Sequence, residues 1–465
     1  MATSTERVTA AAMREGPRGP RGLPVIGIMR ELQKDNIGFL TGIARSYGDV
    51  ARYRLLNRTI YQINHPGAIK RILQDNADNY GKGHFRVSSL TRLVGSGLIM
   101  SEGAFWRRQR RLMQPAFHPK NIASFGEQIV SATYDHVERW TIAAKGGEAL
   151  DIAAEMMRLT LDIATRTLFS SHVGEDLAAI DKALAILNAD VNFRFEVPFY
   201  PPLSVPTPRN HRAAKAIETL DRIVYRLIDD RARQLDEGRE VPPDLLTRLL
   251  QAQDEDSGQG MTRQQLRDEV MTLFIAGHET TAKLLTWCWY LLSTHPDIER
   301  KVHGEAQSAL AGRPPTVGDL QAMPYSRMVL EETLRLYPPA WIMSRQAVGG
   351  DVLCGHAVAA GTLVWFSPYV MHRHPDYWPN PEGFDPERFK ADAVKARPRY
   401  AYFPFGGGGH QCIGKHFALL EAQLVLAAVI QRYSLELVPG RLVVPRALVT
   451  LAPQGGLPMT VRARS

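Results

Sequence analysis

The most distinctive chemistry in this sequence comes from one cysteine that follows a run of four glycines. Residues 405–414 read Phe-Gly-Gly-Gly-Gly-His-Gln-Cys-Ile-Gly, and a helix-like segment, 415–433, comes directly after them. Glycines let a backbone approach a flat partner closely and adopt positive φ angles. A cysteine just ahead of a helix N-terminus feels the positive end of the helix dipole, which favours the thiolate. Thiolates can hold haem iron, so Cys412 is a candidate ligand; the alternative is a structural cysteine in a glycine-rich turn.

A second reactive pattern is the sequence Ala-Gly-His-Glu-Thr-Thr at residues 276–281, inside an expected long helix, 262–293. Gly277 weakens a helix by about 1 kcal/mol relative to alanine. The Thr280 hydroxyl can bond back to the carbonyl of Ala276 and bend the helix. Together they predict a local widening with room for a small bound molecule. Glu279 beside Thr280 is a possible proton-delivery pair. The alternative is a buried helix in which Gly277 permits close packing and Glu279 lies on a solvated face.

A third pattern lies on an expected basic helix, 102–113. Trp106 and Arg110 are four residues apart and therefore share one helix face. Their indole N–H and guanidinium could hold a carboxylate such as a haem propionate. The neighbouring arginines on this helix are interpreted as a solvated basic face; they are Arg107, Arg108 and Arg111.

The spacing Phe-x-x-Gly-x-His-x-Cys-x-Gly resembles the haem-binding loop of the cytochrome P-450 family. Three further motifs stand in that family's order, namely Trp106 with Arg110, residues 276–281, and Glu332 with Arg335. The resemblance covers nearly the whole chain. It implies a mainly α fold with small β-sheets, in which haem b (iron protoporphyrin IX) lies between the long central helix and the cysteine loop.

The same resemblance implies a role for each site residue. Cys412 would be the axial iron ligand, with Phe405 packed beside its sulfur, and Gly406 and Gly414 would belong to the same loop. The residues that would contact haem propionates are His410 (arginine in most members), Trp106, Arg110 and Arg345. Thr280 and Glu279 would be catalytic and deliver protons. Glu332, Arg335 and Arg388 would form a buried structural network, although an isolated glutamate–arginine pair on a helix is more often a surface pair worth about 0.2–0.5 kcal/mol.

The implied reaction is the insertion of one oxygen atom from O2 into a hydrophobic small molecule, such as a fatty acid or a terpenoid. A cysteine thiolate pushes electron density onto haem iron and favours O–O cleavage. The alternatives are a peroxide-dependent or isomerising haem-thiolate enzyme and a non-catalytic haem sensor. The Glu279–Thr280 pair argues against the former, because such enzymes need no proton relay for dioxygen.

The sequence shows no flavin or iron–sulfur domain, so electrons are expected from a separate ferredoxin or flavodoxin with its NAD(P)H reductase. The net charge of +8 and the pI of about 9.3 favour an acidic partner. Basic residues in segments that flank the thiolate side of the resembled fold would receive this donor; they are Arg107, Arg108, Arg111, Lys120 and Lys415.

Substrate-pocket candidates follow from the resemblance too, with ordinary packing as the alternative for each. They are His84, Phe85, Val87, Leu98, Phe274, Ile275, Ala340, Ile342, Leu448 and Val449. The aromatic and proline-rich segment 193–208 is expected to be irregular, and to serve either as a lid over an apolar channel or as a rigid connector.

Composition places the chain among ordinary soluble globular proteins, with 45% hydrophobic and 22% charged residues. Three cysteines give no disulfide framework and fit a reducing cytosol, so we expect a cytoplasmic protein. No apolar run approaches the ~18 residues of a membrane span, and the polar N-terminus lacks a signal-peptide core. We expect neither a transmembrane anchor nor a nucleic-acid partner.

The remaining pattern divides the chain into a disordered tail, 1–16, and a single domain, 17–465. A hairpin is expected at 50–54 and 59–64, and Thr262 with Gln265 has the spacing of a helix capping box. Further helices are expected at 37–47, 66–75, 122–145, 152–168, 174–192, 209–236 and 244–254. His372, His374 and Asp376 lack a full ligand set, so we do not predict a metal site there.

Overall fold

The computed structural model describes residues 16–83, 88–170, 176–197 and 199–464. The chain forms two compact units. The sheet unit comprises Met1–Phe85 and Glu331–Cys412, and the helical unit comprises Arg86–Leu330 and Ile413–Ser465. The predicted disordered tail lies outside the described residues except for Gly16.

The sheet unit is built on a five-stranded sheet in the order β1-β2-β8-β5-β3. The strands are β1 (Val50–Leu55), β2 (Arg58–Ile63), β3 (Tyr80–Gly81), β5 (Met343–Ala347) and β8 (Leu363–Phe366). All neighbours are antiparallel except β2 and β8. β6 (Asp351–Leu353) and β7 (His356–Val358) form a separate ribbon. The predicted hairpin is therefore confirmed, with Leu55 paired to Arg58 across a tight turn.

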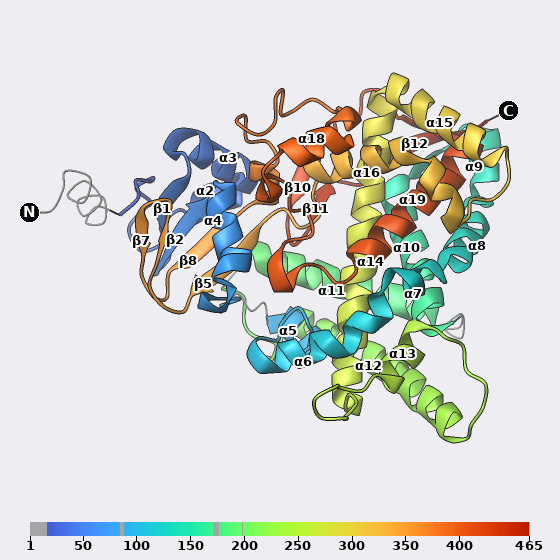
Figure 1. Cartoon of the computed structure of the whole chain (residues 1–465), viewed down its shortest axis with the longest axis horizontal. Coiled ribbons are helices and arrows are strands. Elements are labelled where there is room, and N and C mark those ends of the chain that lie inside the picture. Colours follow the sequence, from blue (N-terminus) through green and yellow to red (C-terminus); the bar gives the residue numbers. More distant parts are fainter. Residues whose placement is uncertain (1–15, 84–87, 171–175, 198, 465) are drawn as a thin grey trace, which may run out of the picture. The chain divides into compact units, whose positions relative to one another are not determined.

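The sheet unit also contains short helices (Figure 1). They are α2 (Met29–Lys34), α3 (Asn36–Tyr47), α4 (Pro66–Lys70), α17 (Pro368–Met371) and α18 (Ala391–Ala396). α4 begins with a proline in its first turn, as helices allow, and continues as a π-helical turn, η1 (Arg71–Asp75). The 3-10 turns are η2 (Ala77–Asn79), η5 (Pro386–Phe389), η6 (Arg399–Ala401) and η7 (Gly408–His410). Side chains of the strands and of α4 share one apolar core that includes Ile63, Ile69 and Phe366.

The helical unit holds the long helices of the protein. Those before the longest one are α5 (Ser88–Val94), α6 (Gly103–Met113), α7 (Pro119–Ala123), α8 (Gly126–Val137), α9 (Trp140–Gly146), α10 (Ile152–Phe169), α11 (Leu177–Glu196), α12 (Pro208–Asp236) and α13 (Leu245–Gln251). Those that follow are α14 (Arg263–Thr294), α15 (Pro296–Leu310) and α19 (Lys415–Arg432), with 3-10 turns η3 (Gln114–Phe117) and η4 (Val317–Ala322). α16 (Pro324–Leu336) carries the chain from the helical unit into the sheet unit.

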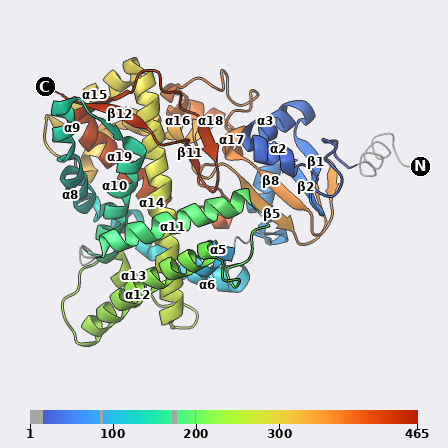
Figure 2. The same ribbon diagram turned by 180° about the vertical axis from the view of Figure 1, so that it is seen from behind.

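Helix α14 forms the centre of the helical unit, and α10, α12 and α19 pack against it (Figures 1 and 2). Its start is confirmed as a capping box, in which Thr262 accepts from the Gln265 amide while the Gln265 side chain accepts from the Thr262 amide. It ends before Pro296, which opens α15. α19 is buried on nearly every side from Leu419 onward, as expected for a helix in the interior of a unit.

Two small β structures complete the helical unit. One is a three-stranded antiparallel sheet of β4 (Ala149–Asp151), β12 (Pro458–Ala463) and β9 (Tyr433–Leu437). The other is a hairpin of β10 (Pro445–Ala447) and β11 (Leu451–Pro453). Among the described residues, every helix is too short or too polar to cross a lipid bilayer.

Two of the predicted elements were wrong. The single helix expected at 122–145 is three helices, α7, α8 and α9, because the chain turns at Ser124–Phe125 and again at Glu138–Arg139. The irregular segment expected at 193–208 begins later, since α11 continues to Glu196. A helix can continue up to the residue before a proline, so Pro198 does not prevent Phe193 and Phe195 from being helical.

Candidate functional site

The glycine loop before Cys412 has a shape that side chains would prevent. Gly406 and Gly408 have φ angles of +69° and +63°, in the left-handed region that favours glycine. A Cβ at Gly408 would lie 1.8 Å from the carbonyl oxygen of Leu73, and one at Gly407 would lie 2.4 Å from the Tyr400 ring. The loop closes with a 2.9 Å hydrogen bond from the Cys412 amide to the Phe405 carbonyl. The glycines are therefore required for the loop to lie against η1 and Tyr400.

Of the three cysteines, Cys412 has the environment that suits an iron ligand. Its side chain is exposed on the loop, as is that of Cys354, whereas Cys288 is completely buried in α14. Cys354 lies in the turn between β6 and β7, and burial raises the pKa of its thiol to about 11. Because the thiolate is the form that binds metals, this shift disfavours Cys354. The residues of the cysteine loop thus fit a haem held by Cys412.

Arg345 lies on the strand face that meets this loop. It is two residues from Met343 on β5, so the two side chains point to the same side of the sheet. A Cβ at Gly406 would lie 3.7 Å from the Met343 methyl carbon. Arg345 also donates to the carbonyl of Ser344 at 2.8 Å. His410 lies in η7 within the loop itself. These positions support the predicted propionate contacts of Arg345 and His410, which stay predictions.

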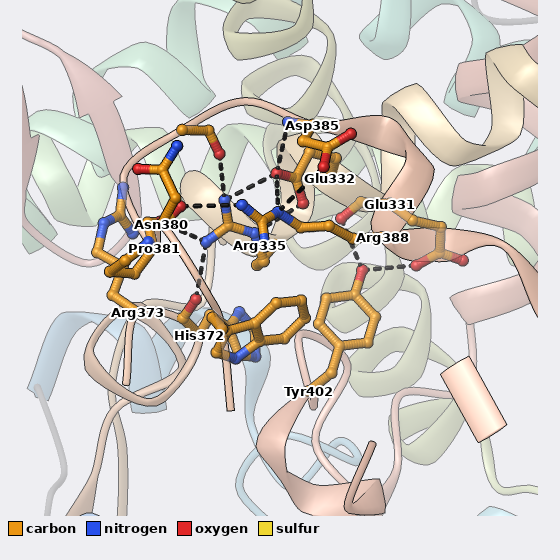
Figure 3. A network of polar contacts seen from close by, with 12 residues as sticks. Glu331, Glu332, Arg335, His372, Arg373, Asn380, Pro381, Asp385, Arg388 and Tyr402 are labelled. Carbon is orange, nitrogen blue, oxygen red and sulfur yellow. Dashed lines mark hydrogen bonds and ion pairs between the residues drawn. The ribbon is translucent and has the colours of Figure 1, made fainter. Parts of the chain in front are cut away.

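A buried ion pair anchors the segment that leads into the loop (Figure 3). Arg335 and Glu332 are both 0% exposed. Nε and NH2 of Arg335 each donate to a Glu332 carboxylate oxygen at 2.7 Å. The other donors of Arg335 reach carbonyls of His372, Pro381 and Gly383 at 2.6–2.9 Å. All five N–H groups of the guanidinium are therefore used.

Glu332 gathers further partners in the same network (Figure 3). Its Oε1 accepts from the Asp385 amide at 2.9 Å and lies 3.5 Å from Nε of Arg388. Burial raises the pKa of Glu332, and its pairing with Arg335 opposes that rise. The predicted network of Glu332, Arg335 and Arg388 is confirmed.

The network reaches the cysteine loop through His372. While its carbonyl accepts from Arg335, its ring Nε2 accepts from the Phe403 amide at 3.0 Å. Trp378, beneath the Arg335 guanidinium, donates to the Ala401 carbonyl at 3.3 Å. Residues 401–403 are thus fixed just before Phe405. The His372 ring is buried, and its pKa is lowered mainly by burial and to a smaller extent by the charge of Arg335. We therefore interpret His372 as a structural side chain.

In the helical unit, α14 carries the predicted proton-delivery residues. The Thr280 hydroxyl donates to the Ala276 carbonyl at 2.7 Å, as predicted, and Thr281 does the same to Gly277 at 3.2 Å. α14 nevertheless remains α-helical throughout, so the predicted local widening does not occur. A Cβ at Gly277 would have no described heavy atom within 4 Å. Close packing is therefore not the reason for this glycine.

Glu279 is buried, with 9% of its surface exposed, so a solvated face is not its environment. Its Oε1 accepts a 2.6 Å hydrogen bond from the hydroxyl of Thr450, in the turn of the β10–β11 hairpin. Sequence reasoning missed Thr450, because 171 residues separate it from Glu279. It also missed Glu421 of α19, whose pKa is raised by burial, a rise that the neighbouring Thr281 opposes. A signal existed for Glu421, namely an acid inside an otherwise apolar helical run.

The basic helix α6 brings Trp106 and Arg110 onto one side as predicted, and both are partly buried. Of the other arginines of this helix, predicted to form a solvated basic face, Arg107 and Arg111 are exposed and Arg108 is partly buried. Arg108 and Arg111 also have partners within the protein. Arg108 donates to the carbonyls of Gln259 and Gly260 at 3.0 and 2.9 Å. Arg111 pairs with Asp254 at 3.0 Å and Asp256 at 2.6 Å. These arginines fix the loop that precedes α14.

The substrate-pocket candidates have different surroundings. Phe274 is buried against Phe169, with ring centroids 5.1 Å apart. Leu98 is buried, and its amide donates to Glu269 of α14 at 3.0 Å. Ala340 and Val449 are exposed, while Ile275, Ile342 and Leu448 are partly buried. His84, Phe85 and Val87 lie outside the described residues.

Comparisons with known proteins find similarity along most of the chain. The family profile described as Cytochrome P450 matches residues 17–454. The chain is 36% identical over 425 residues to cyclooctat-9-en-7-ol 5-monooxygenase of Streptomyces melanosporofaciens, covering 90% of each protein. It is 35% identical over 433 residues to cyclooctatin synthase of the same organism, covering 93% of this chain and 92% of the relative.

Two further likenesses extend this finding. Pentalenene oxygenase of Streptomyces avermitilis is 32% identical over 448 residues, covering 96% of this chain and 97% of that protein. The crystal structure of the cytochrome P450DA heme domain superimposes with a TM-score of 0.87 at 25% identity, covering 97% of this chain and 98% of that one. The similarity therefore spans almost the full length of each relative.

Proposed function

Because the chain belongs to the cytochrome P450 family, we propose that it inserts one oxygen atom from O2 into a terpenoid, with haem b held by Cys412. That it is a haem monooxygenase of hydrophobic small molecules follows from the family and from its monooxygenase relatives. The names of three relatives refer to cyclooctat-9-en-7-ol, cyclooctatin and pentalenene, which supports a substrate of the terpenoid class.

One observation carries the assignment of the site. Cys412 is an exposed cysteine on a loop whose glycines have no room for side chains, and the fully bonded Arg335 network fixes the segment before that loop. A rigid, exposed thiolate is what an axial ligand requires. Haem bound by a thiolate supplies the electron-rich iron that activates dioxygen. Around it, Phe405, Gly406 and Gly414 would shape the ligand loop.

Carboxylate binding and proton delivery would fall to other residues. We assign the binding of the haem propionates to His410, Arg345, Trp106 and Arg110. The arginine and histidine side chains can donate N–H hydrogen bonds to a carboxylate, and tryptophan can donate one through its indole N–H. The Thr280 hydroxyl donates its proton to Ala276, so its oxygen lone pairs can accept a hydrogen bond from water. Glu279 Oε1 is engaged by Thr450, and Oε2 is the oxygen we assign to proton exchange with that water.

We further propose that residues 17–465 act as one domain in the cytoplasm. The enzyme needs a redox partner, and we propose an acidic ferredoxin or flavodoxin served by an NAD(P)H reductase. The basic charge of the chain supports this choice, because opposite charge accelerates association.

The test combines binding and turnover. Purified holoenzyme is titrated with a panel of terpenoids and, in parallel, fatty acids, and the shift of the haem absorption is recorded. Ligands that shift the spectrum are then incubated with a ferredoxin–reductase system, with peroxide alone, or with neither. We expect terpenoids to shift the spectrum and an oxygenated product to form with the reductase system. Oxygenation only with peroxide would favour the peroxide-dependent alternative, and shifts by fatty acids alone would overturn the terpenoid assignment.

A further inference from the structure

The β10–β11 hairpin contacts the acidic residue of the proton-delivery pair directly. The Thr450 hydroxyl donates to Oε1 of Glu279 at 2.6 Å. Thr450 comes immediately before β11, and its carbonyl accepts from the Leu448 amide at 3.2 Å. The side chain that holds Glu279 therefore projects from a tight, hydrogen-bonded turn.

This turn is itself fixed to the long helix. The indole nitrogen of Trp287, eight residues beyond Glu279 on α14, donates to the Leu451 carbonyl at 3.0 Å. Trp287 is completely buried, so this contact lies in the core of the unit. Two points of α14 thus hold adjacent residues of the hairpin, and the Thr450 hydroxyl has little freedom to move away from Glu279.

The other side of the hairpin is tied to α11. The Val449 amide lies 3.4 Å from Oδ1 of Asn192, and Arg446 pairs with Glu196. The hairpin therefore links the C-terminal end of α11 to the carboxylate of Glu279. Any shift of that end of α11 would reach Glu279 through Val449 and Thr450.

We propose that Thr450 is a positioning residue for proton delivery. Its hydroxyl binds Oε1 and so holds Glu279 in one orientation. Oε2 is then left for the water that donates a hydrogen bond to the Thr280 hydroxyl oxygen. A buried carboxylate without this bond would rotate and hold its proton-exchanging oxygen less consistently. The proposal rests on the proposed role of Glu279 and adds a residue that acts through it.

The experiment compares Thr450→Val, which keeps the shape but removes the donor, with Thr450→Ser, which keeps the donor. Product formed per reducing equivalent, peroxide released and the solvent isotope effect on turnover are measured with a surrogate redox system and a substrate from the titration panel. Thr219→Val is the matched control, because the Thr219 hydroxyl binds the Lys215 carbonyl on its own helix, α12. Haem content and substrate affinity are measured for every variant.

We expect Thr450→Val to lower the coupling to product roughly threefold to tenfold, less than the roughly 10²–10⁴-fold contribution of direct acid–base catalysis. Peroxide release and the solvent isotope effect should rise, while Thr450→Ser and Thr219→Val behave like the wild type. In a Glu279→Gln background, Thr450→Val should have no further effect.

Two outcomes would overturn the inference in different ways. Unchanged coupling in Thr450→Val, together with a clear loss in Glu279→Gln, would refute the role of Thr450 alone. An unaffected Glu279→Gln variant would refute the proposed role of Glu279 and the inference with it. Equal losses in Thr450→Val and Thr450→Ser, with weaker substrate binding, would show that the turn matters only for packing and would also refute the proposal.

Discussion

Arg335 and Glu332 are joined by two parallel hydrogen bonds of 2.7 Å although neither side chain is exposed. Burying such a pair is costly, and here the cost is offset because every guanidinium N–H finds an acceptor. Three of those acceptors are backbone carbonyls from 372 to 383, a segment that also contains the histidine bonded to Phe403. The pair therefore fixes the backbone that precedes the cysteine loop.

Replacing Arg335 by lysine should destabilise the protein strongly. Lysine has three donors at one point and cannot serve both the carboxylate and the three carbonyls. Removal of a partner from a buried pair typically costs about 3–5 kcal/mol. We expect a loss of that order in chemical denaturation, together with poor haem retention. Arg313→Lys is the control, since the Arg313 guanidinium that pairs with Asp319 is half exposed, so this variant should change stability less. Equal stability of both variants would contradict this view of the network.

Cys412→Ser should remove the thiolate-type absorption of the reduced, carbon monoxide-treated enzyme. Serine keeps the size of the side chain but does not offer a thiolate ligand. Cys288→Ser and Cys354→Ser serve as controls and should leave the absorption intact. If one of them abolished it while Cys412→Ser did not, Cys412 would not be the ligand.

Thr280→Ala should separate electron consumption from product formation. The variant loses the hydroxyl oxygen that would accept a hydrogen bond from the proton-delivering water. Haem binding is assigned to other residues and should be unaffected. We expect normal haem content, less product per reducing equivalent and more peroxide. Thr294→Ala is a control on the same helix, because the Thr294 hydroxyl bonds back to Tyr290. Unchanged peroxide release in Thr280→Ala would rule out this role.

Acid stability should depend on Glu155 of α10. Burial raises its pKa, but hydrogen bonds from His136 and Trp140 outweigh burial and hold the pKa at about 2. The folded value lies below the ordinary glutamate value of 4.5, so the stabilisation is present above about pH 4.5 and is lost as the pH falls towards 2. Each unit of such a shift corresponds to about 1.4 kcal/mol.

Glu155→Gln should therefore lower stability by about 1–3 kcal/mol at pH 6 and weaken its dependence on pH below 4.5. Denaturant unfolding from pH 3 to 7 measures both effects. Glu138→Gln is the control, because that carboxylate is largely exposed. If stability of the Glu155→Gln variant depended on pH as in the wild type, the contacts of Glu155 with His136 and Trp140 would add no acid-dependent stability.

Reduction by an acidic donor should be slowed by Lys415→Glu without any change in substrate affinity. Charge steering acts on the association rate and weakens as salt screens it. Arg108→Glu is less informative, because Arg108 also holds the carbonyls of Gln259 and Gly260. Lys215→Glu, on α12 outside the predicted docking segments, is the control. If the stopped-flow reduction rates changed neither with salt nor with Lys415→Glu, the basic residues of the predicted docking segments would serve solubility only.

The sequence by itself determined the features that depend on residues a few positions apart. The capping box of Thr262 and Gln265, the bond from Thr280 to Ala276 and the pairing of Glu332 with Arg335 are all settled within one helical turn. The glycine loop was equally visible, because its chemistry is written in consecutive residues. Spacing along the chain fixes such contacts directly, since helix geometry is the same in every protein.

Tertiary structure alone decided the contacts between distant segments. Nothing in the sequence pairs Thr450 with Glu279, gives Arg335 the carbonyls at 372, 381 and 383, or ties Arg108 to Gly260. The breaks that divide 122–145 into three helices were hidden for the same reason. A residue type shows that a side chain is a donor or an acceptor, or that a helix can end there. Its partner depends on which distant segment lies beside it, and the packing of the whole unit decides that.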